Sequence, residues 1–148
     1  MTGMTPPLDG VRVLDFSRVI AGPLCTQHLA DLGAEVIKVE SIEDGEVGAD
    51  DAAVPGRNPL FLAFNRSKKS IALNLKARGG PELALALALQ CDVLVENFRP
   101  GVMKRFGLDP EAVRAADPKL IYVSISAFGA DGSMSDRPGL DPVLQAES

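Results

Sequence analysis

Short apolar runs rich in β-branched side chains alternate along the chain with stretches of helical composition. Five runs predict strands, over residues 11–16, 34–40, 69–75, 92–95 and 120–126. Helices are predicted between them over residues 23–32, 59–64, 79–91, 101–106 and 110–116. Strands that alternate with helices are typical of a Rossmann-like α/β fold, an open and mainly parallel sheet with flanking helices. We expect residues 1–148 to form one such domain.

One helical prediction goes against the periodicity of its own sequence. The run from Leu83 to Leu89 alternates Leu and Ala with a period of two, which is the strand pattern. We predict a helix there, because Leu and Ala are strong helix formers and Gly80-Pro81-Glu82 is a good helix start. Residues 59–64 are apolar and short, and we expect a helical turn packed on the core. Residues 141–146 predict the start of a further helix.

The run over residues 92–95 ends abruptly in the polar sequence Glu96-Asn97-Phe98-Arg99-Pro100-Gly101. Pro100 disfavours helix at Arg99, and Gly101 can turn the backbone into a new helix. A buried strand therefore leads into a loop that presents an amide, an aromatic ring and a guanidinium. Ligands of open α/β sheets bind at the carboxyl ends of strands, so this loop is a candidate binding site. An ordinary turn at a strand end is the equal alternative.

Charge is segregated along the chain. Residues 40–51 carry six acids and no base, which predicts a mobile surface loop, whereas the bases from Arg57 to Arg78 have no acid among them. A wholly basic stretch in a chain of net charge −5 indicates a local anion site. A solvated basic face explains the same pattern equally well.

Composition narrows the class of protein. The chain is 46% hydrophobic and 24% charged, as expected of a soluble domain, and its net negative charge disfavours nucleic acid. No apolar run is long enough to cross a membrane and no signal peptide is evident, so a cytoplasmic protein is expected. Cys25 and Cys91 fall in predicted helices and are expected to pack as free thiols. No metal site, dinucleotide fingerprint or P-loop is predicted.

Few residues are candidates for catalysis. His28 lies three positions after Cys25, so the pair could share a helix face, although a packed or surface histidine is the commoner case. Asp15 lies near the end of the first strand and Asp141 follows the glycine-rich loop over residues 128–139. Either carboxylate could face a cleft as a nucleophile or base, but no spacing links them.

Several ordered motifs resemble the class III coenzyme A (CoA) transferases, the group of formyl-CoA transferase, carnitine CoA-transferase and α-methylacyl-CoA racemase. The resemblance extends from Leu8 to Ser148. It is carried by Val13-Leu14-Asp15-Phe16, Arg18-Val19-Ile20-Ala21-Gly22-Pro23, Leu32-Gly33-Ala34-Glu35-Val36-Ile37-Lys38-Val39-Glu40, Asn65-Arg66-Ser67-Lys68-Lys69-Ser70-Ile71, Val95-Glu96-Asn97-Phe98-Arg99-Pro100-Gly101 and Arg137-Pro138-Gly139-Leu140-Asp141-Pro142-Val143-Leu144-Gln145-Ala146.

The resemblance implies a CoA site but no catalytic residue and no permanently bound cofactor. The pantetheine arm would lie against Ile20 and Ala21, the adenine and phosphates against Leu73, Asn74, Leu75 and Lys76, and the pyrophosphate end against Asn97, Phe98, Arg99 and Arg105. Ser41 stands where family members often carry a basic residue, and the family's Asp-x-x-Arg after it is absent, so some phosphate contacts differ.

The implied function is transfer of CoA between carboxylic acids through an aspartyl anhydride. The family's nucleophilic aspartate lies beyond Ser148, so the chain resembles an N-terminal portion, is expected to be inactive alone, and is expected to self-associate. Longer family members form interlocked homodimers. An α-methylacyl-CoA racemase is a weaker alternative, because Leu140 replaces the histidine of that branch. A CoA-binding or structural module without catalysis is the other alternative. Acyl-CoA and carboxylic acids are the expected partners, without nucleic acid or membrane.

Overall fold

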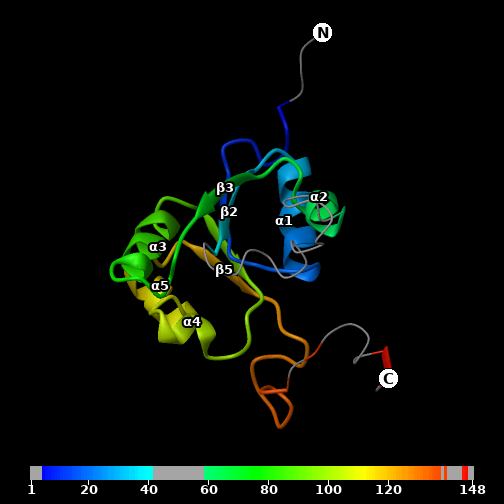
Figure 1. Cartoon of the computed structure of the whole chain (residues 1–148). Coiled ribbons are helices and arrows are strands. Elements are labelled where there is room, and N and C mark those ends of the chain that lie inside the picture. Colours follow the sequence, from blue (N-terminus) through cyan, green and yellow to red (C-terminus); the bar gives the residue numbers. More distant parts are fainter. Residues whose placement is uncertain (1–4, 42–58, 138, 140–144, 147–148) are drawn as a thin grey trace.

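A computed structural model describes residues 5–41, 59–137, 139 and 145–146 of the chain (Figure 1). The strands in these residues are β1 (Arg12–Asp15), β2 (Glu35–Glu40), β3 (Lys69–Ala72), β4 (Val93–Glu96) and β5 (Ile121–Ser124). The helices are α1 (Ala21–Asp31), α2 (Pro59–Asn65), α3 (Gly80–Ala88), α4 (Val102–Arg105) and α5 (Pro110–Ala116). None of the described helices is both long and apolar enough to cross a bilayer.

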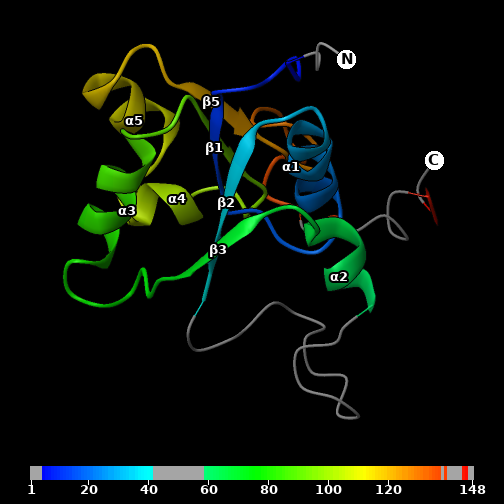
Figure 2. The same ribbon diagram turned by 90° about the horizontal axis from the view of Figure 1, so that it is seen from above.

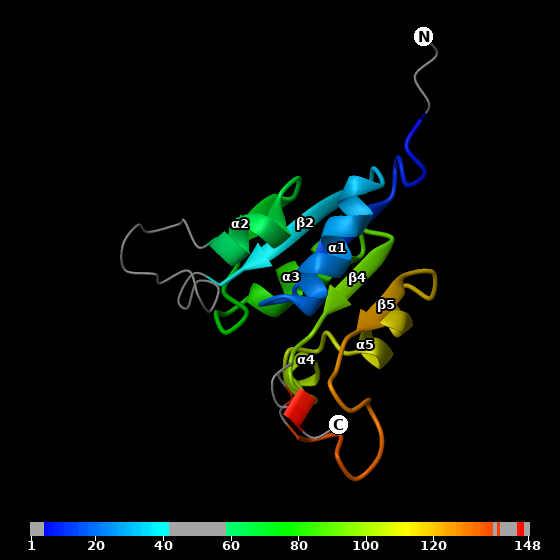
Figure 3. The same ribbon diagram turned by 90° about the vertical axis from the view of Figure 1, so that its right-hand side faces the viewer.

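The five strands form one sheet in the order β3-β2-β1-β4-β5, and every neighbouring pair is parallel. The labelled strand arrows in Figure 3 accordingly point the same way. The chain builds outward from β1 to β3 and then crosses to β4 on the other side of β1. The predicted Rossmann-like, open parallel α/β fold is confirmed.

Helices cover both faces of the sheet, with α1 and α2 on one side and α3, α4 and α5 on the other (Figures 1 and 2). Successive strand side chains point to opposite faces, which divides the core into two clusters. Val13 and Val95 pack beneath α1 in one cluster, whereas Leu14 and Leu94 pack against the other three helices. Both faces of the central strands are therefore buried, as parallel sheets require.

The helix predicted against its period of two is confirmed as α3. Ala84 and Ala88 are fully buried and lie four residues apart on one helix face, whereas Leu83 is about half exposed. The small alanines, rather than the leucines, allow the helix to approach the sheet closely. The start of α5 is capped by Asp109, whose side chain accepts hydrogen bonds from two backbone N–H groups of the first turn.

Three local predictions were wrong. Cys91 lies in a turn after α3, where its N–H donates to the Ala88 carbonyl at 2.9 Å, and not in the helix. The strand predicted to residue 75 ends at Ala72, because the chain then turns toward α3. Helix α2 forms as predicted but is not packed on the core, since Leu60 and Leu62 are more than half exposed and none of its residues is buried. The acidic stretch over residues 42–51 lies outside the described residues.

Candidate functional site

The candidate site lies where β1 and β4 end side by side. The chain reverses its direction of sheet growth between these two strands, and such a topological switch point leaves a crevice outside their carboxyl ends. The loops after β1, β2, β3 and β4 all start at this edge, because the strands are parallel. Two adjoining cavities are found there.

The first cavity has a volume of about 440 Å³ and is lined by residues from the ends of four strands. Its walls are mainly apolar, and its cationic side chains are Arg18, Lys76 and Arg105. Glu40 is the acid in its lining, and that carboxylate accepts a hydrogen bond from the Ser70 hydroxyl. The full lining is Phe16, Arg18, Val39, Glu40, Ser41, Leu73, Asn74, Leu75, Lys76, Phe98, Val102, Arg105 and Phe106.

The second cavity, of about 300 Å³, shares Phe98 with the lining of the first. Arg99 and Arg137 give it a positive character, and serine hydroxyls line it as well. The Arg137 guanidinium lies 5.4 Å from the centre of the Phe128 ring. Its lining is Ala21, Asn97, Phe98, Arg99, Pro100, Ile125, Ser126, Ala127, Ser135, Arg137 and Gly139.

Nine of the ten residues predicted from sequence line one or both of these cavities. Leu73, Asn74, Leu75, Lys76 and Arg105 line the first, Ala21, Asn97 and Arg99 line the second, and Phe98 lines both. Ile20 lines neither of them; it is 41% exposed and sits at the N-cap of α1. The predicted residues thus gather at one edge of the sheet but do not share a single cavity.

Residues 73–76 line the first cavity and form a turn that packs closely against the start of α3. The Asn74 side-chain oxygen accepts a hydrogen bond from the Lys76 N–H at 2.8 Å, and the Asn74 carbonyl accepts one from Ala77 at 3.2 Å. A Cβ atom on Gly80 would lie 2.1 Å from that carbonyl oxygen. Glycine at the start of α3 therefore fixes where the cavity wall runs.

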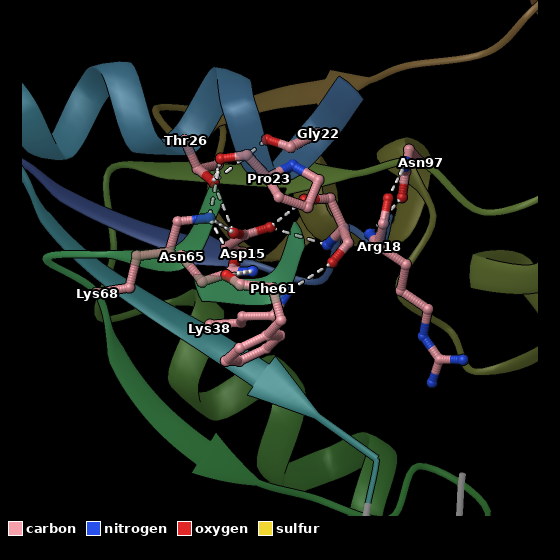
Figure 4. Close-up of polar contacts among 11 residues, drawn as sticks. Asp15, Arg18, Gly22, Pro23, Thr26, Lys38, Phe61, Asn65, Lys68 and Asn97 are labelled. Carbon is pink, nitrogen blue, oxygen red and sulfur yellow. Dashed lines mark hydrogen bonds and ion pairs between the residues drawn. The ribbon is translucent and has the colours of Figure 1, made fainter. Parts of the chain in front are cut away.

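Asn97 joins the two loops at the switch point. Its side-chain oxygen accepts a hydrogen bond from the Arg18 N–H at 2.7 Å, and its side-chain NH₂ group donates one to the Arg18 carbonyl at 2.8 Å (Figure 4). The next residue, Phe98, donates its N–H to the buried Glu96 carboxylate at 2.8 Å and carries the Arg18 guanidinium 5.6 Å from its ring centre. The loop after β4 therefore holds the loop after β1 through both backbone and side chain.

The sequence prediction missed two cavity cations, Arg18 of the first cavity and Arg137 of the second. Arg18 follows a strand by three residues, as Arg99 follows β4, and stands in a motif that resembles the family. Its position after the first strand was available from the sequence, but the contact with Phe98 depends on β1 and β4 being neighbours. The apolar wall residues Phe16, Val102 and Phe106 were missed for the same reason.

A buried polar network supports the loop after β1 (Figure 4). Asp15 is fully buried, and its carboxylate accepts hydrogen bonds from Thr26 Oγ1 at 2.6 Å, from Lys68 Nζ at 3.0 Å and from the N–H and hydroxyl of Ser17. Lys68 also donates to the Pro23 carbonyl and to the Asn65 side chain, both at 2.9 Å. The prediction that Asp15 could face a cleft is wrong, because neighbours enclose the carboxylate completely.

The basic stretch over residues 57–78 does not form one anion site. Three of its cations pair with acids from elsewhere in the chain: Lys68 with Asp15, Lys69 with Glu35 at 2.6 Å, and Arg66 with Asp31 at 2.6 Å. Among the described residues of this stretch, Lys76 is the cation that lines a cavity. The local excess of positive charge is balanced by acids on β1, β2 and α1, which the linear sequence places far away.

The thiols and the histidine show no sign of catalysis. Burial is the main cause that raises the pKa of Cys25, with the Asp15 carboxylate as a further cause, and burial likewise raises the pKa of Cys91. Both cysteines are free, and His28 is exposed on α1. In the described part of the chain, no group of three or more His, Cys, Asp or Glu side chains is placed to hold a metal ion. Asp141 lies outside the described residues.

The chain is similar to known CoA-transferases. The model of CoA-transferase family III matches residues 8–148. The chain is 48% identical to the "Probable fatty acyl-CoA transferase Rv3272" of Mycobacterium tuberculosis over 96% of this chain and 37% of that protein. It is 44% identical to the human succinyl-CoA:glutarate CoA-transferase over 96% of this chain and 33% of that protein.

Solved structures give the same result. A CAIB/BAIF family protein from Brucella suis superimposes with a TM-score of 0.90 at 40% identity, over 97% of this chain and 39% of that one. The chain thus spans between a third and two fifths of the length of these relatives.

Proposed function

The chain belongs to CoA-transferase family III, and on this premise we propose that it forms the CoA-binding domain of an enzyme that transfers CoA between carboxylic acids. The observation that carries the proposal is the first cavity: apolar walls next to three cations at the switch point of a parallel sheet. A nucleotide with several phosphates needs this combination, because its base requires apolar contact and its phosphates require cationic donors.

A ligand that fills both cavities would cross Phe98. The adenosine and phosphates of CoA fit the first cavity, with Lys76 and Arg105 as phosphate partners. The pantetheine arm would then pass Ala21 toward the second cavity, where Arg99 lies. The thioester would stand at that end, and acyl-CoA and a carboxylic acid would be the substrates. The domain itself would hold no permanent cofactor.

The transfer that we propose needs a carboxylate nucleophile. Its attack on the acyl-CoA carbonyl forms a C–O bond and breaks the C–S bond, so that CoA leaves as the thiolate and a mixed anhydride remains. The enclosed Asp15 is unsuitable for that attack. We propose that the nucleophile comes from polypeptide beyond residue 148, in a second domain or a partner subunit of a homodimer. Residues 1–148 would then bind CoA without turnover.

Titration calorimetry with CoA tests the proposal. We expect saturable binding that weakens roughly tenfold or more in the Arg105→Met variant, because a charge-assisted contact is worth about 1.5–3 kcal/mol. Arg114→Met is the matched control, since Arg114 is an exposed arginine of α5 that lines neither cavity. Undetectable binding of CoA to the wild-type chain at millimolar concentration would refute the proposal.

The alternative of a module without catalysis is favoured by one observation: Asp15, the strand-end carboxylate that could have served as a nucleophile, is fully buried and lines neither cavity. Measuring CoA transfer to a carboxylic acid in a longer chain that contains this domain would separate the alternatives. Transfer would exclude the module, and racemisation of a 2-methylacyl-CoA without transfer would favour the racemase. Sedimentation of the 148-residue chain tests the expected self-association.

A further inference from the structure

The Arg18 guanidinium occupies an unusual position among the cations of this chain. It lies over the Phe98 ring at 5.6 Å from the ring centre and lines the first cavity. Within the described residues, its side chain makes no hydrogen bond and no ion pair. Lys68, Lys69 and Arg66, in contrast, are paired with acids. A guanidinium held near an aromatic ring can still donate its N–H groups to a planar or tetrahedral anion.

The backbone that carries Arg18 is held unusually firmly. Both hydrogen bonds of the Asn97 amide, at 2.7 and 2.8 Å, end on the backbone of Arg18. The following residue, Val19, has a φ of 68°, a left-handed conformation that a β-branched residue rarely adopts. Strained backbone of this kind persists only where its surroundings determine it and is frequent at binding sites. The hydrogen bonds from Asn97 to Arg18 fix the backbone on one side of Val19.

Position decides which phosphate Arg18 can reach. Phe98 contributes to both cavities, so Arg18 lies where a ligand passes from one to the other. In CoA the diphosphate joins the adenosine to the pantetheine arm and would cross at this point. Lys76, on the turn after β3, lies on the side of the first cavity formed by the ends of β2 and β3 and is placed for the 3′-phosphate.

We propose that Arg18 binds the diphosphate of CoA, and that Asn97 is a positioning residue that acts through the Arg18 backbone instead of contacting the ligand. This inference rests on the proposed function and changes the role expected for Asn97. The carboxamide of Asn97 accepts one hydrogen bond from the Arg18 N–H and donates one to the Arg18 carbonyl, and these two bonds join the loops. The guanidinium fork can donate two parallel hydrogen bonds to one phosphate group, which an ammonium cannot match.

The first experiment compares the binding of CoA and 3′-dephospho-CoA by calorimetry in wild-type, Arg18→Met and Arg18→Lys chains. We expect Arg18→Met to weaken both ligands by the same factor, roughly ten- to a hundredfold, and Arg18→Lys to weaken them less. If Arg18→Met weakened the binding of CoA but not of 3′-dephospho-CoA, Arg18 would be assigned to the 3′-phosphate and the inference would be overturned. Unchanged affinity of Arg18→Met for CoA would also overturn the inference. In that case the binding of CoA by the wild-type chain would still support the proposed function. Absent wild-type binding refutes both.

The second experiment tests how Asn97 acts. Asn97→Asp keeps an oxygen for the Arg18 N–H but replaces the donor that the Arg18 carbonyl requires. We expect this variant to weaken CoA binding in the wild-type background and to add little in the Arg18→Met background, because its effect passes through Arg18. Equal losses in both backgrounds would show direct contact with CoA and overturn the positioning role. Thermal melting of each variant monitors the fold, and the Arg18 series decides the diphosphate assignment if Asn97→Asp does not fold.

Discussion

Replacing Lys68 by methionine is predicted to destabilise the fold more than any exposed charge change. The Lys68 side chain is 2% exposed and its ammonium lies 3.0 Å from the fully buried Asp15 carboxylate. Methionine has a similar length and keeps the apolar contacts of the lysine stem, so the variant removes mainly the charge. It removes the ammonium partner of the Asp15 carboxylate, which keeps its hydrogen bonds from Thr26 and Ser17.

The magnitude follows from the geometry. At 3.0 Å, and with an effective dielectric constant of about 20, two unit charges attract by about 5 kcal/mol. Breaking a buried pair by removing one partner generally costs about 3–5 kcal/mol. Domains are stable by about 5–15 kcal/mol in total, so the variant is expected to lose a large share of its stability. Asp15→Asn should also be destabilising, and the double variant should cost less than the sum of the two single variants.

Urea denaturation followed by circular dichroism measures these free energies of unfolding. Lys69→Met is the matched control: Lys69 is the adjacent residue and also forms an ion pair, but its side chain is 71% exposed, and exposed pairs are worth about 0–1 kcal/mol. We expect Lys68→Met to cost at least about 2 kcal/mol more than Lys69→Met. Equal costs would refute the view that a desolvated ion pair secures the loop after β1.

Three further predictions address other parts of the molecule. Gly80→Ala should weaken CoA binding, because the new Cβ would lie 2.1 Å from the Asn74 carbonyl oxygen. Gly79→Ala, whose Cβ meets no atom within 4 Å, should cost about 1 kcal/mol of stability through its φ of 82° and leave CoA binding unchanged. Calorimetry with CoA compares the two variants, and equal affinities would contradict the close approach at Gly80. The hydrogen bond from Lys69 lowers the pKa of Glu35, so Lys69→Met should move that pKa up toward its ordinary value in an NMR titration. The stability difference between this variant and wild type should be present above the unfolded pKa of Glu35 and vanish as the pH falls through its lowered folded pKa; a difference that persists in acid would assign it to another group. Because burial raises the pKa of both Cys25 and Cys91, their thiols should react with Ellman's reagent at mildly alkaline pH more slowly in the folded chain than in urea, and equal rates would count against their burial.

The elements of the fold were largely predictable because local signals are strong in this chain. The Asp109 cap fixes the start of α5, and the helical composition around Ala84 outweighs its misleading alternation. The candidate site was predictable in outline, since a parallel sheet brings all strand ends to one edge and the sequence marks those ends with polar residues. The motifs that resemble the family indicated which of these strand ends would contact a ligand.

The partners of individual charges were not predictable, because they depend on pairings between distant strands. Lys68 belongs to a basic stretch in the sequence, yet its partner Asp15 comes from β1, 53 positions earlier. Arg18 and Phe98 meet only because β1 and β4 are neighbours, and the division of the site into two cavities depends on where the Phe98 ring lies. Spacing along the chain contains no information on these contacts.

The central pairing of the sheet also constrains how the chain folds during synthesis. Val13 of β1 pairs with Val93 of β4, so the middle of the sheet can close only after the ribosome has released both segments. Until then a nascent chain can assemble β1, α1 and β2, which leaves the second face and one edge of β1 uncovered. Closing so long a loop is slow, and a chaperone that shields Leu14 in this interval should raise the yield of folded protein.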